Sequence, residues 1–161
     1  MLKRTSKQLS LSSSLEDMLS HQNPLFQLSH KINWQRFDDA FSPLYCSTNG
    51  RPDHPIRLMC GLLILKHLRN VSDEMVVSQW SENAYYQYFC GGLEFTPKEP
   101  CDASELVHFR NRIGEKGMEI ILAESSGYEK MFELYYRGLS QNSKSRNKVY
   151  SLHEPEVVCI S

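Results

Sequence analysis

The stretch that decides the fold is residues 55–70, which read PIRLMCGLLILKHLRN. Its apolar side chains cover most of the circumference of a helix, which predicts a central helix buried on nearly all sides. Proline suits the first turn of a helix, and Asp53 or His54 is expected to cap it. Four basic residues mark the side of the helix expected to face solvent; they are Arg57, Lys66, His67 and Arg69. We expect this helix to end near Asn70.

The segment before the central helix predicts two shorter helices. The first begins at residues 25–28, directly after the punctuating Asn-Pro pair at residues 23–24. The second spans about residues 32–41, where three aromatic side chains recur at helical spacing. Residues 42–52 contain two prolines and an Asn-Gly pair, so we expect a loop there.

The segment after the central helix carries a series of helix-start signals. Ser72 is expected to cap one helix, and Asn83 a short aromatic-rich helix that stops at the glycine pair of residues 91–92. Asp102 and Glu105 have the spacing of a capping box. These signals predict short turns between closely packed helices.

The helix that follows Asp102 should end at Gly114, with one more helix over about residues 116–124. No segment with the two-residue period of a strand occurs before residue 148. The predicted fold class is therefore mostly α, with six or seven helices in a domain that spans residues 25–124.

The two ends of the chain have a different character. Residues 1–24 are predicted to be a flexible tail, and residues 125–148 a helix followed by a basic linker. Residues 149–161 predict two short β-strands around a turn. Two strands alone are marginally stable in water, so we interpret them as the remnant of a larger sheet domain.

The composition excludes several functional classes. The net charge is −1 and the sequence pI is about 6.6, so affinity for nucleic acid must come from local clusters of Lys and Arg. The five cysteines show no zinc-binding spacing, which fits a reducing cytoplasm. The longest uncharged run, residues 58–65, is far shorter than the roughly 20 residues that span a bilayer. We expect a soluble cytoplasmic protein with no membrane contact.

A series of motifs follows in order between residues 25 and 124. They are WQRF (34–37), FSPLYC (41–46), NGRP (49–52), IRLM (56–59), LKHL (65–68), Trp80, YFCGG (88–92) and FRNRIG (109–114). This series resembles the N-terminal helical domain of insertion-sequence transposases of the IS-five type. Residues 148–161 are similar to a second stretch of that family, which lies inside its RNase H-like catalytic domain. The resemblance implies a role in DNA transposition, with transposon ends as the DNA partner.

The chain departs from that family at the catalytic positions. In the family, an Asp-Thr-Thr-type strand and a long helical stretch separate the two similar regions, whereas here Glu124 passes directly into Ser125-Ser126-Gly127. The second Asp and the final Glu would lie beyond residue 161. We interpret the chain as a truncated or internally deleted copy with no catalytic residues and no cofactor. Intact members would need Mg²⁺ held by those acids, so we expect no catalytic activity from this chain alone.

One helix face combines the side chains expected to contact DNA. Ser104, His108, Asn111 and Arg112 recur at spacings of four, seven and eight residues. Such side chains suit base edges and phosphates, and an ordinary solvated face is the alternative. The apolar side chains of the same helix fall on its opposite side; they are Leu106, Phe109 and Ile113.

Two further groups of basic residues are candidates for phosphate contact. The first comprises Arg51, Arg57, Lys66 and Arg69, and the second, in the basic linker, comprises Lys144, Arg146 and Lys148. For Arg57 the alternative is pairing with Asp53 or capping a loop, and for the linker it is plain solubility. The aromatic residues between Trp80 and Phe89 are expected to pack in the core rather than stack on bases.

These observations favour a truncated transposase-like protein that keeps its DNA-binding region. The competing interpretations are a helical protein-interaction or dimerisation module and a non-functional remnant of a mobile element. The expected partners are DNA at the transposon ends and a second protein chain, in a homodimer or in a heteromer with intact transposase.

Overall fold

The computed structural model describes residues 14–45 and 54–128, and this part of the chain is helical with no strand. Its elements are α1 (Leu15–Met18), α2 (Pro24–Lys31), α3 (Trp34–Phe41), the 3₁₀ helix η1 (Ser42–Leu44), α4 (Ile56–Arg69), α5 (Asp73–Glu82), α6 (Ala84–Phe89) and α7 (Ala103–Ser125). The mostly α fold class is confirmed. The expected basic linker and the β-strands of residues 149–161 lie outside the described residues. The chain divides into two units, residues 1–126 and 127–161, and all of these helices lie in the first.

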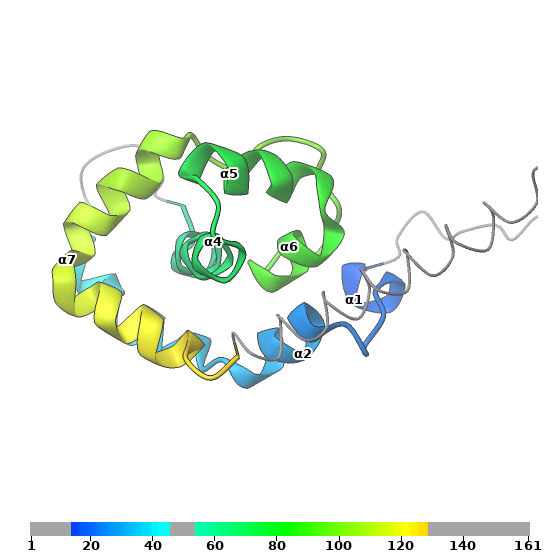
Figure 1. Ribbon diagram of the computed structural model, residues 1–161, viewed down its shortest axis with the longest axis horizontal. Coiled ribbons are helices and arrows are strands. Elements are labelled where there is room, and N and C mark those ends of the chain that lie inside the picture. Colours follow the sequence, from blue (N-terminus) through cyan, green and yellow to red (C-terminus); the bar gives the residue numbers. More distant parts are fainter. Residues whose placement is uncertain (1–13, 46–53, 129–161) are drawn as a thin grey trace, which may run out of the picture. The chain divides into compact units, whose positions relative to one another are not determined.

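Helix α4 is the centre of this unit, as the sequence predicts. Every residue from Leu58 to Leu65 is buried, and α3, α5 and α7 pack against the helix. Figure 1 shows α4 end-on with α5, α6 and α7 arranged around it. Each fully buried leucine or isoleucine stabilises the fold by about 1.5–3 kcal/mol, so this helix supplies a large share of the hydrophobic stabilisation. In the described part of the chain, none of the helices combines the length and the apolar composition that a membrane span requires.

A glycine lets the end of α6 approach α4 closely. A Cβ atom built on Gly61 would lie 2.7 Å from the sulfur of Cys90 and 3.2 Å from its Cα atom. Real Cβ atoms do not come so close, so a larger residue at position 61 would push the two helices apart.

The helix starts follow the predicted caps, with one exception. The side chain of Ser72 accepts from the backbone N–H of Met75, and Asp102 and Glu105 form the complete capping box at the start of α7. The exception is α4, whose N-cap is Pro55 with no side-chain cap, because His54 is instead hydrogen-bonded to Glu105. The prediction that Asp53 or His54 caps α4 is therefore wrong for His54, and Asp53 lies outside the described residues.

Helix α7 contains a break where the sequence predicts a helix end. Gly114 has φ 66° and ψ −171°, a conformation that is essentially restricted to glycine. The predicted helix up to Gly114 and the predicted helix after it are thus two segments of α7. The second segment packs on α3, where a Cβ on Gly117 would lie 3.1 Å from the ring of Phe41.

Residues 14–24 do not behave as the flexible tail that the sequence suggests. Ser14 caps α1, Leu15 is only 1% exposed, and the Leu15 N–H donates to the carbonyl of Leu93 at 2.8 Å. The four-residue α1 is too short for its amphipathic pattern to predict a packed helix. The packed unit therefore starts before the predicted boundary at residue 25.

Candidate nucleic-acid interface

The outer face of α7 is exposed and mostly polar in its first segment, with Val107, which is 41% exposed, between the polar side chains. Ser104, His108 and Asn111 are exposed, whereas the opposite side of the same segment is buried in the core through Leu106 and Phe109. The predicted alternation between a core face and a solvent face is therefore present. The capping box holds the start of this face in place, because it fixes the first turn of the helix.

Arg112 lies at the edge of this face and turns toward a different element. Its guanidinium carbon is 4.5 Å from the centre of the Tyr45 ring, which is a cation–π contact. Beside this pair is a hollow of about 210 Å³, which we name the His54 hollow. It is lined by Tyr45, His54, Met59, Glu105, His108, Phe109 and Arg112.

The His54 hollow is braced by a pair of side chains from distant parts of the sequence. His54 Nε2 lies 3.0 Å from Glu105 Oε2, and both side chains are about one quarter exposed. The same Glu105 oxygen accepts from the backbone N–H of Asp102 at 2.9 Å. The capping box therefore fixes Glu105, and Glu105 in turn orients the imidazole of His54.

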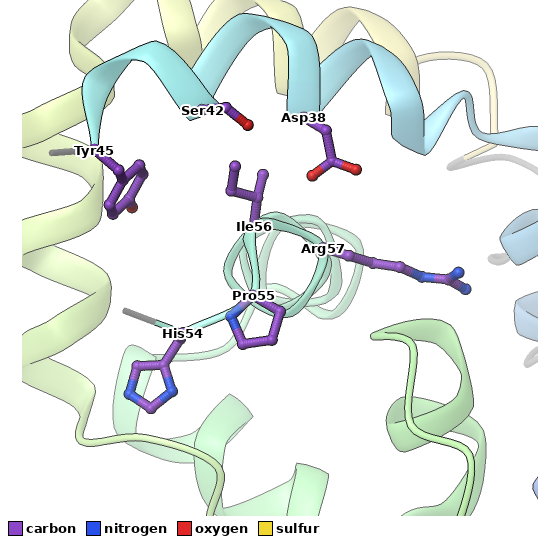
Figure 2. A pocket seen from close by; sticks show the side chains of 7 residues that line it. All are labelled: Asp38, Ser42, Tyr45, His54, Pro55, Ile56 and Arg57. Atoms are coloured by element: carbon purple, nitrogen blue, oxygen red, sulfur yellow. The ribbon is translucent and has the colours of Figure 1, made fainter. Parts of the chain in front are cut away.

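A larger cavity of about 430 Å³ adjoins this hollow and shares Tyr45 and His54 with it. Figure 2 shows Asp38 and Ser42 pointing from α3 and η1 toward α4, while Arg57 extends away from Tyr45 and His54. The two hollows thus meet at the residues that flank the start of α4.

Arg57 is held by contacts within the helical domain. Its guanidinium donates to the carbonyls of Phe89 at 3.4 Å and Tyr88 at 3.5 Å, and it lies 4.6 Å from the centre of the Trp34 ring system. Burial lowers the pKa of Arg57 from its ordinary value. The side chain therefore caps the carbonyl end of α6, whereas the pairing with Asp53 considered for it involves a residue outside the described part of the chain.

Lys66 takes part in an ion-pair network between α4, α5 and α7. Its Nζ lies 2.9 Å from Asp73 Oδ1, and Arg110 binds both Asp73 oxygens at 2.9 and 2.8 Å. Burial alone would raise the pKa of Asp73, but the hydrogen bonds from Arg110 and Lys66 hold that pKa below its ordinary value. The network ties together three helices that surround the core.

One further basic residue of the predicted patch lies in the described part of the chain. Arg69 lies 5.6 Å from the centre of the Tyr86 ring and lines a separate hollow with Gln79 and Glu82. The described members of the predicted phosphate-contacting patch are thus held by three different sets of neighbours. The other candidates lie outside the described residues; they are Arg51, Lys144, Arg146 and Lys148.

The described residues do not fit a divalent-metal site. Within residues 14–45 and 54–128, no three His, Cys, Asp or Glu side chains converge as metal ligands. The Mg²⁺ that intact members of the resembled family would need therefore has no set of ligands in this part of the chain.

Sequence reasoning missed Tyr45, and it gave His54 and Glu105 only capping roles. The His54–Glu105 pair joins residues 51 positions apart, and the Tyr45–Arg112 pair joins two different elements. The capping-box motif located Glu105 correctly, but it contained no sign that the same carboxylate also meets a histidine.

These features define a helical domain with a polar outer face on α7 and a hollow beside it. Residues 13–112 match the family described as "Transposase domain (DUF772)", and the chain belongs to this family of transposase domains. No solved structure matches the chain.

The chain is also similar to a protein of Rhizobium meliloti named "Uncharacterized protein ORF8 in nfe locus". The two are 43% identical over 111 residues, which cover 69% of this chain and 53% of that protein. The chain thus spans about half the length of this relative.

Replacing Asp73 with Asn is expected to destabilise the domain by about 2 kcal/mol at neutral pH, because it removes the charge that Arg110 and Lys66 bind. The folded-state pKa of Asp73 is lowered, so its contribution is complete above the unfolded-state value of about 3.9 and is lost as the pH falls through the folded-state value. Urea denaturation of both proteins as a function of pH measures this difference.

The gap in unfolding free energy between the wild type and D73N should therefore shrink below about pH 4. Asp39→Asn is the matched control, since Asp39 is an exposed carboxylate outside the network, and it should change stability by less than about 0.5 kcal/mol. A D73N gap that stays constant from neutral to acid pH would contradict the role given to the network.

Proposed function

We propose that the chain acts in DNA transposition by binding duplex DNA at transposon ends through the outer face of α7. The observation that carries this proposal is the exposed row of Ser104, His108 and Asn111, which share one face of a helix whose other face is fixed in the core. A side chain on a rigid, packed helix is held in place for base contacts better than one on a loop.

The dimensions and chemistry of this face suit the major groove. The groove is about 12 Å wide and accepts a helix of about 10–12 Å diameter. Asparagine can form two hydrogen bonds with adenine, and serine can bond to several base edges. Asn111, seven residues after Ser104, lies two helical turns along the same face, so the two side chains would meet different base pairs.

Because the chain is nearly neutral, discrimination between DNA sequences should come mostly from contacts with the bases. A net charge of −1 gives little general attraction to DNA, so tight binding to any sequence is not expected. Specific binding would then depend on the few polar side chains of the α7 face, together with local cations such as Arg112.

The finer assignment rests on the resemblance described above. We place the chain with the IS-five type, and we interpret it as a copy with an internal deletion. The support is the order of its motifs and the direct passage from Glu124 into Ser125-Ser126-Gly127. The catalytic acids of the intact transposase would then lie outside the two stretches that resemble the family.

A protein-interaction role is the alternative, and a specific observation favours it. Leu93 is 78% exposed and Met18 is 60% exposed, and the backbones of their segments are joined by the Leu15–Leu93 hydrogen bond. If these side chains form a contiguous apolar surface, that surface would suit contact with another protein. Sedimentation of the chain with and without DNA separates the two roles, since a dimer unaffected by DNA favours the second.

Replacing Asn111 with Ala is expected to weaken binding to terminal-repeat DNA by about 1–3 kcal/mol, which is about 5- to 150-fold. Fluorescence anisotropy measures this with a duplex from the end of the mobile element and with a scrambled duplex of the same composition. Gln27→Ala is the matched control, because Gln27 is an exposed amide on α2. Equal affinity of the wild type for both duplexes, or equal losses in N111A and Q27A, would refute a base-reading role for this face.

The purified chain is expected not to cleave or join DNA, because the acids that would hold two metal ions over a phosphodiester are not carried over from the family. Incubation with supercoiled plasmid and Mg²⁺ or Mn²⁺ tests this. Metal-dependent nicking that disappears on replacement of one of the chain's own Asp or Glu residues would overturn this expectation.

A further inference from the structure

The His54 hollow combines groups that a base-reading helix face does not require. Three basic side chains line it, from two different parts of the chain: His54, His108 and Arg112. Because Nε2 of His54 is bonded to Glu105, His54 can donate to an anion only through Nδ1, when its ring is protonated. The carboxylate among them, Glu105, is already engaged by His54 and by the backbone N–H of Asp102. Its negative charge is therefore partly satisfied within the protein.

The donors are positioned rather than freely mobile. Arg112 lies over the ring of Tyr45, which restricts its guanidinium to the edge of the hollow. The ring of His54 is oriented by Glu105. His108 precedes Arg112 by four residues on α7, so the two side chains are neighbours on one helix face. These contacts fix the side chains before a ligand binds, and this lowers the conformational entropy lost on binding.

We propose that the His54 hollow binds a phosphate group, and that in the DNA complex this is a phosphate of the duplex backbone. The second part rests on the proposed function. A guanidinium matches the geometry of phosphate oxygens, and imidazole N–H groups supplement it. A hollow of about 210 Å³ has room for a tetrahedral phosphate.

The position of the His54 hollow indicates what a phosphate contact there would do. Arg112 and Asn111 are adjacent in the sequence and about 100° apart around the helix, so one turn of α7 would hold the backbone and reach a base edge together. A phosphate contact fixes the register of a helix on the duplex but carries no sequence information of its own. The hollow would therefore position the α7 face, and Asn111 and Ser104 would read the bases.

The test compares Arg112→Ala with Arg36→Ala in the full chain. Arg36 is an exposed arginine on α3 that pairs with Glu124, away from the His54 hollow. Binding to the terminal and scrambled duplexes is measured by anisotropy over a range of salt concentrations. R112A should weaken binding to both duplexes by a similar factor and reduce the slope of log affinity against log salt by about 1. R36A should leave the slope unchanged.

A second measurement detects the phosphate group without DNA. The imidazole NMR signals of His54 and His108 are followed during titration with inorganic phosphate, with chloride at equal ionic strength as the control. Both signals should respond to phosphate in the wild type and respond less in R112A, while those of His21 and His30 stay unchanged. Arg112→Lys keeps the charge but loses the paired donors, so it should be intermediate. It also provides a folded variant if R112A does not fold.

The outcomes separate this inference from the proposed function. Normal salt slopes in R112A together with weakened binding in N111A would refute a contact between the His54 hollow and a DNA phosphate and leave DNA recognition by α7 standing. If the imidazole signals of His54 and His108 respond to inorganic phosphate but the chain binds no DNA, the phosphate site is supported. The inference that its phosphate belongs to DNA is then refuted. Failure of both measurements would refute the phosphate site altogether.

Discussion

Burial of the whole circumference of α4 is the constraint on which the rest of this structure depends. A helix that is apolar all around must be covered on every side, and α3, α5 and α7 provide that cover. Each covering helix commits one face to the core, and the face that remains is available for other contacts. For the first segment of α7 that remaining face is polar, since Ser104, His108 and Asn111 lie there.

The same constraint explains why Arg57 and Lys66 of α4 each contact neighbouring helices. Arg57 and Lys66 emerge from a helix enclosed by neighbours, so each meets a nearby partner before it reaches solvent. Arg57 caps α6 through two carbonyls, and Lys66 joins Arg110 at Asp73. Arg112, by contrast, lies on the covering helix α7 and lines the His54 hollow. Residues that look alike in sequence therefore differ in role according to the helix that carries them.

The sequence predicts the features of this fold that arise from local patterns. The buried α4, the caps at Ser72 and Asp102 and the break at Gly114 all follow from spacing and backbone preference within a few residues. The contacts that shape the candidate site are different in kind. The His54–Glu105 pair and the Tyr45–Arg112 contact join distant positions through the packing of α4 and α7. A single sequence carries no pattern that records such pairings, and the same reason hid the attachment of α1 to Leu93.

The proposed function requires that the outer face of the first α7 segment meets DNA. Site-directed photo-crosslinking tests it most directly, with the photoreactive residue placed at Val107, which is 41% exposed on α7, or at Met75, which is 50% exposed on α5. With a terminal-repeat duplex, position 107 should crosslink to DNA and position 75 should not. Crosslinks from position 75 alone, or none from position 107 in a chain that binds the duplex, would contradict the claim.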